Sequence, residues 1–171
     1  IYNDMTSEKR MNRLICGDVG SGKTIVGVIA VYISYLSNYQ SALLAPTEIL
    51  AKQHYENITK LFSGTNLKTA LLLGSTKKKE KESILRDLSS GKIDLLIGTH
   101  AMLNEKVNFK NLGLVITDEQ HRFGVNQRES LRNKGLLPDI LYMSATPIPR
   151  TYALTIYGDM EISLIKTKPS G

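Results

Sequence analysis

One stretch near the start of the chain has the residue types and spacing of a loop that binds phosphate groups. It follows the pattern G-x-x-x-x-G-K-[ST] and consists of Gly17, Asp18, Val19, Gly20, Ser21, Gly22, Lys23 and Thr24. Glycines let several backbone N–H groups approach phosphate oxygens, and a helix that starts at the loop adds its positive N-terminal end. The Lys23 ammonium can reach the β- and γ-phosphates, and the Thr24 hydroxyl can bind Mg²⁺. The stretch therefore predicts a site for a nucleoside triphosphate with Mg²⁺; an ordinary glycine-rich turn is the alternative.

A second candidate site follows the apolar run 114–116, where Asp118 and Glu119 come at the end of a predicted strand. Such an acidic pair is the usual partner of a phosphate-binding loop. Asp118 would hold the Mg²⁺ shell, directly or through water, and Glu119 would activate a water for attack on the γ-phosphate. An acidic pair alone is common after strands. Together with the loop it predicts a nucleotide hydrolase rather than a transferase, with Lys23, Asp118 and Glu119 as the catalytic residues.

The sequence pattern predicts that strands alternating with helices position these residues. The strands are short, continuous apolar runs, which is typical of a sheet buried on both faces. They are expected at 11–16, 41–45, 69–73, 93–97, 112–116, 140–143 and 162–165. This alternation predicts an α/β fold with a mainly parallel sheet. The polar motifs follow strand ends, and that edge of an open parallel sheet is where ligands bind.

Helices are expected between these strands, and two of them carry a prediction about burial. One helix is expected at 25–36, and because the stretch 25–35 is apolar almost all round, we expect this helix to be buried. Further helices are expected after Lys77, at 123–134 and at 150–157. Thr47 can cap a helix from 48 to about 62, whose inner side would carry Ile49, Leu50, Tyr55, Ile58 and Leu61.

Composition restricts the class of protein. The chain has 171 residues, 42% hydrophobic and 22% charged, which fits one globular domain. Its net charge of +6 is compatible with a nucleic-acid partner without establishing one. Lys77, Lys78, Lys79 and Lys81 either form a solvated helix face or contact a nucleic-acid backbone. The single cysteine, Cys16, indicates a reducing, cytoplasmic compartment, and no apolar run reaches the ~18 residues of a membrane helix.

The residues around the acidic pair carry a resemblance to a known family. Asp118-Glu119-Gln120-His121 resembles the DExH box of superfamily 2 helicases and translocases. Three further blocks resemble motifs Ia, Ib and III of that superfamily: Ala45-Pro46-Thr47-Glu48, Gly98-Thr99-His100 and Ser144-Ala145-Thr146. The stretches 17–24, 45–51, 118–125 and 146–151 are similar to the RecG family of branch-migration helicases. The related transcription-repair coupling factors usually have Glu where Gln120 stands, and the RecG family would be expected to have Gln in place of Cys16.

The resemblance implies a RecA-like domain of the phosphate-loop NTPase type, a three-layer α/β/α sandwich that uses ATP and Mg²⁺. Residues 1–171 would be the first of two such motor domains in a longer protein, with the second motor domain and a branched-DNA-binding domain outside this chain. The strand 140–144 would lie between the strand of the loop and the strand of Asp118. The implied residues fall into two groups, those that couple nucleotide to DNA (Gln120, His121, Ser144 and Thr146) and those that contact DNA (Thr47, Gly74, Ser75, Thr99 and His100).

The leading hypothesis from the resemblance is an ATP-dependent DNA helicase or translocase that remodels branched DNA, by fork reversal and Holliday junction branch migration, in recombination and repair. It would act as a monomer, with DNA and the second motor domain as partners and no membrane. The alternatives are the motor domain of a transcription-repair coupling factor and a nucleotide-binding interaction module without turnover. The isolated chain is expected to be a weak ATPase, because arginines of the second domain would be missing and no glutamine precedes Gln40 to recognise adenine.

Overall fold

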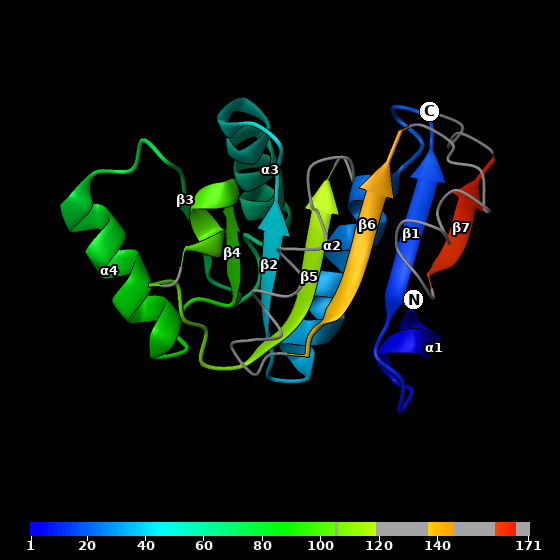
Figure 1. The fold of residues 1–171 in the computed structure, drawn as a ribbon, viewed down its shortest axis with the longest axis horizontal. Coiled ribbons are helices and arrows are strands. Elements are labelled where there is room, and N and C mark those ends of the chain that lie inside the picture. Colours follow the sequence, from blue (N-terminus) through cyan, green and yellow to red (C-terminus); the bar gives the residue numbers. More distant parts are fainter. Residues whose placement is uncertain (105, 119–136, 146–159, 167–171) are drawn as a thin grey trace.

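The sheet at the centre of the molecule determines where the candidate residues lie. The computed structural model describes residues 1–104, 106–118, 137–145 and 160–166, and these form a seven-stranded sheet in the order β3-β4-β2-β5-β6-β1-β7. All neighbouring strands pair in parallel (Figure 1). The predicted α/β fold is confirmed, and each predicted strand agrees to within two residues. The strands are β1 (Asn12–Gly17), β2 (Gln40–Leu44), β3 (Thr69–Leu72), β4 (Leu95–Gly98), β5 (Leu112–Asp118), β6 (Asp139–Ser144) and β7 (Glu161–Ile165).

Among the described residues, the helices expected after β1, β2 and β3 are present, and a short helix that was not predicted follows β4. The described helices are α1 (Tyr2–Met5), α2 (Lys23–Leu36), α3 (Glu48–Leu61), α4 (Lys78–Ser89) and a short 3-10 helix, η1 (His100–Leu103). The hydroxyl of Thr47 accepts a hydrogen bond from Leu50 N–H at 3.2 Å, so the predicted cap of α3 is confirmed. The helices expected at 123–134 and 150–157 lie outside the described residues. None of the helices that the structure describes is long and apolar enough to cross a membrane.

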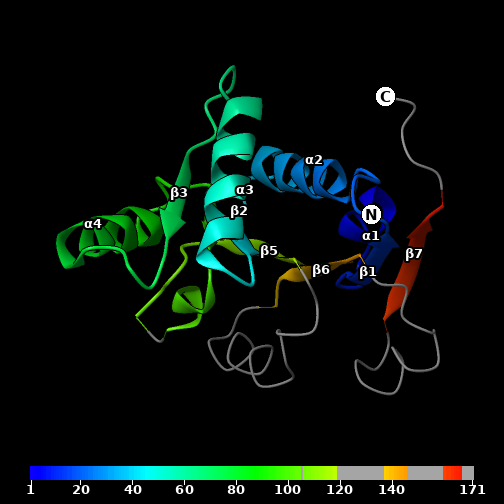
Figure 2. The ribbon, with the colours of Figure 1, turned by 90° about the horizontal axis from the view of Figure 1, so that it is seen from above.

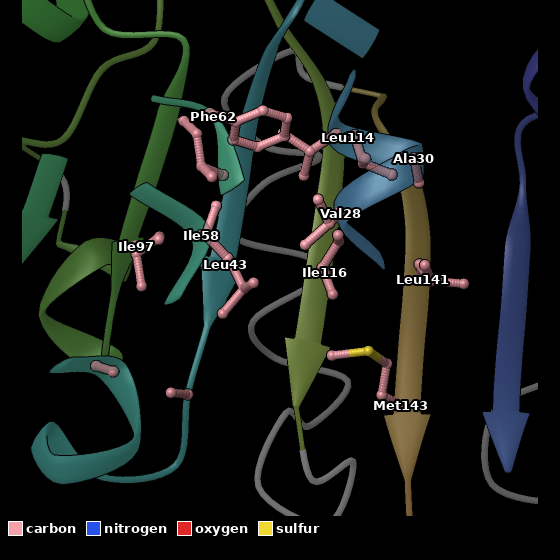
Figure 3. Close-up of a cluster of buried hydrophobic side chains, with 14 of the residues drawn as sticks. Val28, Ala30, Leu43, Ile58, Phe62, Ile97, Leu114, Ile116, Leu141 and Met143 are labelled. Carbon is pink, nitrogen blue, oxygen red and sulfur yellow. The ribbon is translucent and has the colours of Figure 1, made fainter. Parts of the chain in front are cut away.

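The hydrophobic core has two parts because each central strand points alternate side chains to opposite faces of the sheet. Helices α2 and α3 lie over one face (Figure 2). There Val28 of α2 and Ile58 of α3 join Ile116 of β5 in one buried cluster (Figure 3). A second cluster joins Leu88 of α4 to Val115, the neighbour of Ile116 in β5. A sheet covered on both faces in this way needs continuous apolar strands, as the sequence shows.

The prediction that the first long helix is buried all round is wrong. Ile25, Ile29, Tyr32 and Leu36 of α2 are 38–63% exposed. They are spaced by three or four residues, so they lie along one side of the helix. A helix that lies on a sheet buries only the opposite side, and composition alone cannot reveal which side remains uncovered.

The prediction of which α3 residues face the core is only partly correct. Ile58 is fully buried, and Leu50 and Tyr55 are partly buried against the core. Ile49 and Leu61 are instead 71% and 57% exposed. The face that meets the sheet also carries an alanine and a histidine, which a search for large apolar residues does not detect.

Polar contacts fix the register of β1 at the opposite end of the sheet. Arg13 in β1 donates from Nε and Nη2 to the two carboxylate oxygens of Asp4 in α1, and from Nη1 to Ser163 Oγ in β7 at 2.8 Å. The hydrogen bonds from Arg13 lower the pKa of Asp4. At the start of β6, Asp139 accepts a hydrogen bond from Met11 N–H at 2.7 Å. These contacts hold β6, β1 and β7 together at their amino ends, so their carboxyl ends are also aligned.

Gly98 provides a test of how closely the outer strands pack. A Cβ atom at this position would lie 2.1 Å from the backbone oxygen of Leu72 in β3. Because backbone cannot move aside without breaking the strand pairing, we expect Gly98→Ala to lower the free energy of unfolding by about 2–3 kcal/mol in urea titrations. Gly64→Ala is the matched control, since no atom lies within 4 Å of its added Cβ, and its change should stay within about 0.5 kcal/mol. Equal stability of the two variants would contradict the close packing of β3 on β4.

Candidate functional site

The candidate residues that the structure describes lie along one edge of the sheet, because parallel strands bring their carboxyl ends together. The order of the strands divides this edge into two halves. β5, β6 and β1 end at Asp118, Ser144 and the predicted phosphate-binding loop, whereas β3, β4 and β2 lead into the predicted DNA contacts. The predicted position of the 140–144 strand is confirmed, since β6 pairs with both β5 and β1. The two halves meet where β2 pairs with β5.

The predicted phosphate-binding loop turns sharply between β1 and α2. Gly20 and Gly22 have φ angles of 78° and 91°, a region that side chains other than glycine rarely adopt. Gly22 is the N-cap residue, so the first turn of α2 faces the loop. The Lys23 ammonium donates hydrogen bonds to the backbone oxygens of Gly17, at 2.5 Å, and of Asp18, at 2.8 Å. The cation therefore lies directly over the loop.

The geometry of the loop fits a bound phosphate group. Ser21 Oγ is buried and has no hydrogen-bond partner among the described residues. A Cβ at Gly17 would lie 2.6 Å from this oxygen, so the glycine leaves just enough room for it. Thr24 stands in the first turn of α2 and is exposed. A pocket of about 260 Å³ lies between the start of the loop and the ends of β6 and β7. The Lys23 cation, the N-terminal end of α2 and the Ser21 hydroxyl thus gather where an anion would be held.

Asp118 ends β5 and forms a side-chain hydrogen bond that the sequence did not indicate. Its Oδ2 lies 2.7 Å from Nε2 of His54 in α3. Both side chains are mostly covered, with 18% of Asp118 and 11% of His54 exposed. His54 comes 64 residues earlier in the chain. The only sequence signal for this contact is a histidine on the face of α3 that also carries Ala51 and Ile58.

Ser144 lies at the end of β6, beside the strand that leads into the loop. It is fully buried and pairs in register with Cys16, the residue before Gly17. Cys16 is itself buried in the second hydrophobic cluster. The strand order therefore brings Ser144 next to the loop, as the resemblance implies. Four other predicted residues lie outside the described ranges: Glu119, Gln120, His121 and Thr146.

A glutamate carboxylate connects the segment that follows β2 to the segment that follows β3. Glu48, the first residue of α3, accepts hydrogen bonds from the Ser75 hydroxyl at 2.8 Å and from Ser75 N–H at 3.1 Å. The hydroxyl contact is the main cause that lowers the pKa of Glu48. Gly74 and Ser75 are exposed, and so is Thr47, whose hydroxyl caps α3. The structure therefore brings two of the three predicted DNA-contact segments together through Glu48, which the sequence analysis did not select.

The third predicted DNA-contact segment follows β4. Thr99 is the N-cap residue of η1, but its side chain makes no capping hydrogen bond. His100 is exposed beside it. In the parts of the chain that the structure describes, no three His, Cys, Asp or Glu side chains come together to hold a metal ion.

The parallel sheet, the glycine-rich loop at the end of β1 and the acidic residue at the end of β5 define a RecA-like nucleotide-binding domain. The family model for DEAD/DEAH box helicases matches residues 2–155. The chain therefore belongs to the DEAD/DEAH box helicase family, and the predicted resemblance to superfamily 2 helicases is confirmed.

Individual relatives agree with this assignment. The chain is 56% identical over all 171 residues to the ATP-dependent DNA helicase RecG of Bacillus subtilis, and equally to that of Thermotoga maritima. It spans 25% and 22% of the length of these two relatives. A solved structure of RecG bound to a three-way DNA junction matches 99% of the chain with a TM-score of 0.85 and 52% identity. The helicase domain of Pyrococcus furiosus Hef matches 92% of the chain with a TM-score of 0.69, at 20% identity, and so supports the fold alone.

The Glu48–Ser75 contact gives a prediction that does not depend on function. Ser75→Ala removes the hydroxyl donor, so the pKa of Glu48 should rise toward its ordinary value, measured by NMR titration of the side-chain carboxyl. The folded pKa lies below the ordinary one. The contact therefore stabilises the fold above the ordinary pKa of glutamate and is lost as the pH falls through the folded value. Ser63→Ala, at an exposed serine after α3, is the control. An unchanged Glu48 titration in Ser75→Ala would rule out the hydroxyl contact.

Proposed function

We propose that this chain is the first of two RecA-like motor domains of a longer ATP-dependent DNA helicase that remodels branched DNA in recombination and repair. The observation that carries the proposal is the single sheet edge, on which the loop, Asp118 and Ser144 occupy β1, β5 and β6. The relatives named above are ATP-dependent DNA helicases, and one of them is bound to a DNA junction. The chain spans about a quarter of their length. The second motor domain and the branched-DNA-binding domain are part of the proposal.

In this proposal ATP and Mg²⁺ bind at the loop. Backbone N–H groups of residues 17–24 hold the phosphates, Lys23 neutralises the β- and γ-phosphates, and Thr24 and Asp118 hold Mg²⁺ directly or through water. Bound Mg²⁺ would stabilise the negative charge that develops on the phosphates. Glu119 orients a water and accepts its proton as the water attacks the γ-phosphate.

DNA would lie along the β3-β4-β2 half of the edge. Thr47, Gly74, Ser75, Thr99 and His100 offer hydroxyl, imidazole and backbone N–H groups, which suit contacts with sugar and phosphate that ignore base sequence. Gln120, His121, Ser144 and Thr146 would report the state of the γ-phosphate to this surface. The proposed protein acts as a monomer in the cytoplasm, and its net charge of +6 favours a polyanionic partner.

Substitution of the two central residues tests the site. Lys23→Ala should abolish ATP turnover in the complete protein and leave its circular dichroism spectrum unchanged, because it removes the side-chain cation of the loop. Glu119→Gln should still bind Mg·ATP but hydrolyse it very slowly, because the amide keeps the shape of the side chain and cannot accept the proton. Lys52→Ala, at an exposed lysine of α3, is the control. Normal hydrolysis by Lys23→Ala, or loss of nucleotide binding in Glu119→Gln, would contradict the assigned roles.

The two-domain proposal predicts that residues 1–171 alone hydrolyse ATP poorly and do not unwind DNA. Arginines from a second motor domain contribute on the order of 10³–10⁵ in rate when they stabilise the transferring phosphoryl group. Steady-state ATPase rates of the chain and of the complete protein, each with and without forked DNA, measure the difference. DNA-stimulated turnover by the chain at the rate of the complete protein would overturn the proposal.

A further inference from the structure

His54 occupies an unusual position for a polar side chain. It lies on the face of α3 that meets the sheet, one helical turn from Ala51 and from Ile58, both of which are fully buried. At this position a hydrophobic residue would add to the core. The imidazole instead lies near the end of β5, where its Nε2 is 2.7 Å from Oδ2 of Asp118.

The chemistry of the pair determines the direction of the hydrogen bond. An ionised carboxylate can only accept, so Nε2 of His54 carries the proton and donates it to Oδ2. The hydrogen bond uses Oδ2 of the carboxylate. It restricts the rotation of the carboxylate about its Cβ–Cγ bond without occupying Oδ1.

Helix α3 holds His54 firmly in this position. Its first turn is capped by Thr47 and tied through Glu48 to Ser75. Ala51 and Ile58 anchor its inner side in the core. Glu48 and His54 are six residues apart, a rise of about 9 Å along the helix. One rigid helix thus contacts the end of β3 with its first residue and the end of β5 with a residue farther along, which joins the two halves of the sheet edge.

We propose that His54 is a positioning residue that orients the Asp118 carboxylate for Mg²⁺, and that it makes metal binding depend on the position of α3. The role rests on the proposed function, since it requires that Asp118 serves Mg²⁺·nucleotide. A carboxylate that binds a metal is commonly held by a second hydrogen bond of this kind, and loss of such a partner typically weakens metal affinity by about 10–100-fold. In this proposal His54 contacts Asp118 and not the metal or the reacting atoms, so its effect passes through the Asp118 carboxylate.

Binding of a fluorescent ATP analogue, titrated at a series of Mg²⁺ concentrations and in EDTA, tests the role in the 171-residue chain. His54→Leu should raise the Mg²⁺ concentration for half-maximal binding by about tenfold and leave binding in EDTA unchanged. His54→Gln should restore most of the Mg²⁺ affinity, because the amide nitrogen of Gln reaches the place of Nε2. His54→Asn, with a donor too short to reach Asp118, should behave like His54→Leu. Gln53→Leu, at the exposed neighbouring residue of α3, is the matched control.

The outcomes separate this role from the proposed function. Wild-type chain that binds the analogue equally well with Mg²⁺ and with EDTA would overturn the use of Mg²⁺ at this site, and the role of His54 with it. Mg²⁺-dependent binding in the wild type with an unchanged Mg²⁺ requirement in His54→Asn would overturn only the role of His54. A purely structural His54 would lower the melting temperature in all three variants without changing the Mg²⁺ requirement. If His54→Leu does not fold, the difference between His54→Asn and His54→Gln decides the question.

Discussion

The parallel pairing of β5, β6 and β1 is the constraint on which the rest of the structure depends. Parallel strands deliver all their carboxyl ends to one edge, so residues more than a hundred positions apart meet there. The register pairs Cys16 with Ser144 and Asp118 with Met143. Insertion of β6 between the other two strands places Ser144 beside the loop and separates the loop from Asp118 by one strand. This spacing suits a ligand that spans the loop and Asp118, such as a nucleoside triphosphate with its metal.

The same sheet gives the molecule a second half with a different chemical character. The ends of β3, β4 and β2 present hydroxyls, a histidine and exposed backbone, whereas the ends of β5, β6 and β1 present the carboxylate of Asp118 and the ammonium of Lys23. Helix α3 links these halves, with Glu48 on Ser75 at one point and His54 on Asp118 at another. A displacement of the β3 loop would thus act on the Asp118 carboxylate through a single rigid element. In the proposed motor domain, the double contact of α3 would be one physical route by which nucleotide chemistry responds to DNA.

One side of α2 is exposed because the helix lies on the sheet and buries only the side that faces it. Its inner residues complete the core over β5 and β6, while Ile25, Ile29, Tyr32 and Leu36 remain in contact with solvent. A row of exposed apolar side chains on one helix is uncommon on an isolated domain.

The sequence by itself determined the strands, their parallel arrangement and the loop, because these depend on local spacing and on continuous apolar runs. It also indicated the family, through the resemblance of its short motifs. In a short motif the residue types themselves indicate the chemistry. Gly20 and Gly22 allow the positive φ angles of the turn, and Lys23 supplies a positive charge. Only the tertiary structure decided which side of each helix is covered and which distant side chains meet. His54 and Asp118 are 64 residues apart, and Glu48 and Ser75 come from different elements. No local pattern encodes either pair, since both arise where the sheet order brings the ends of separate strands and one helix together.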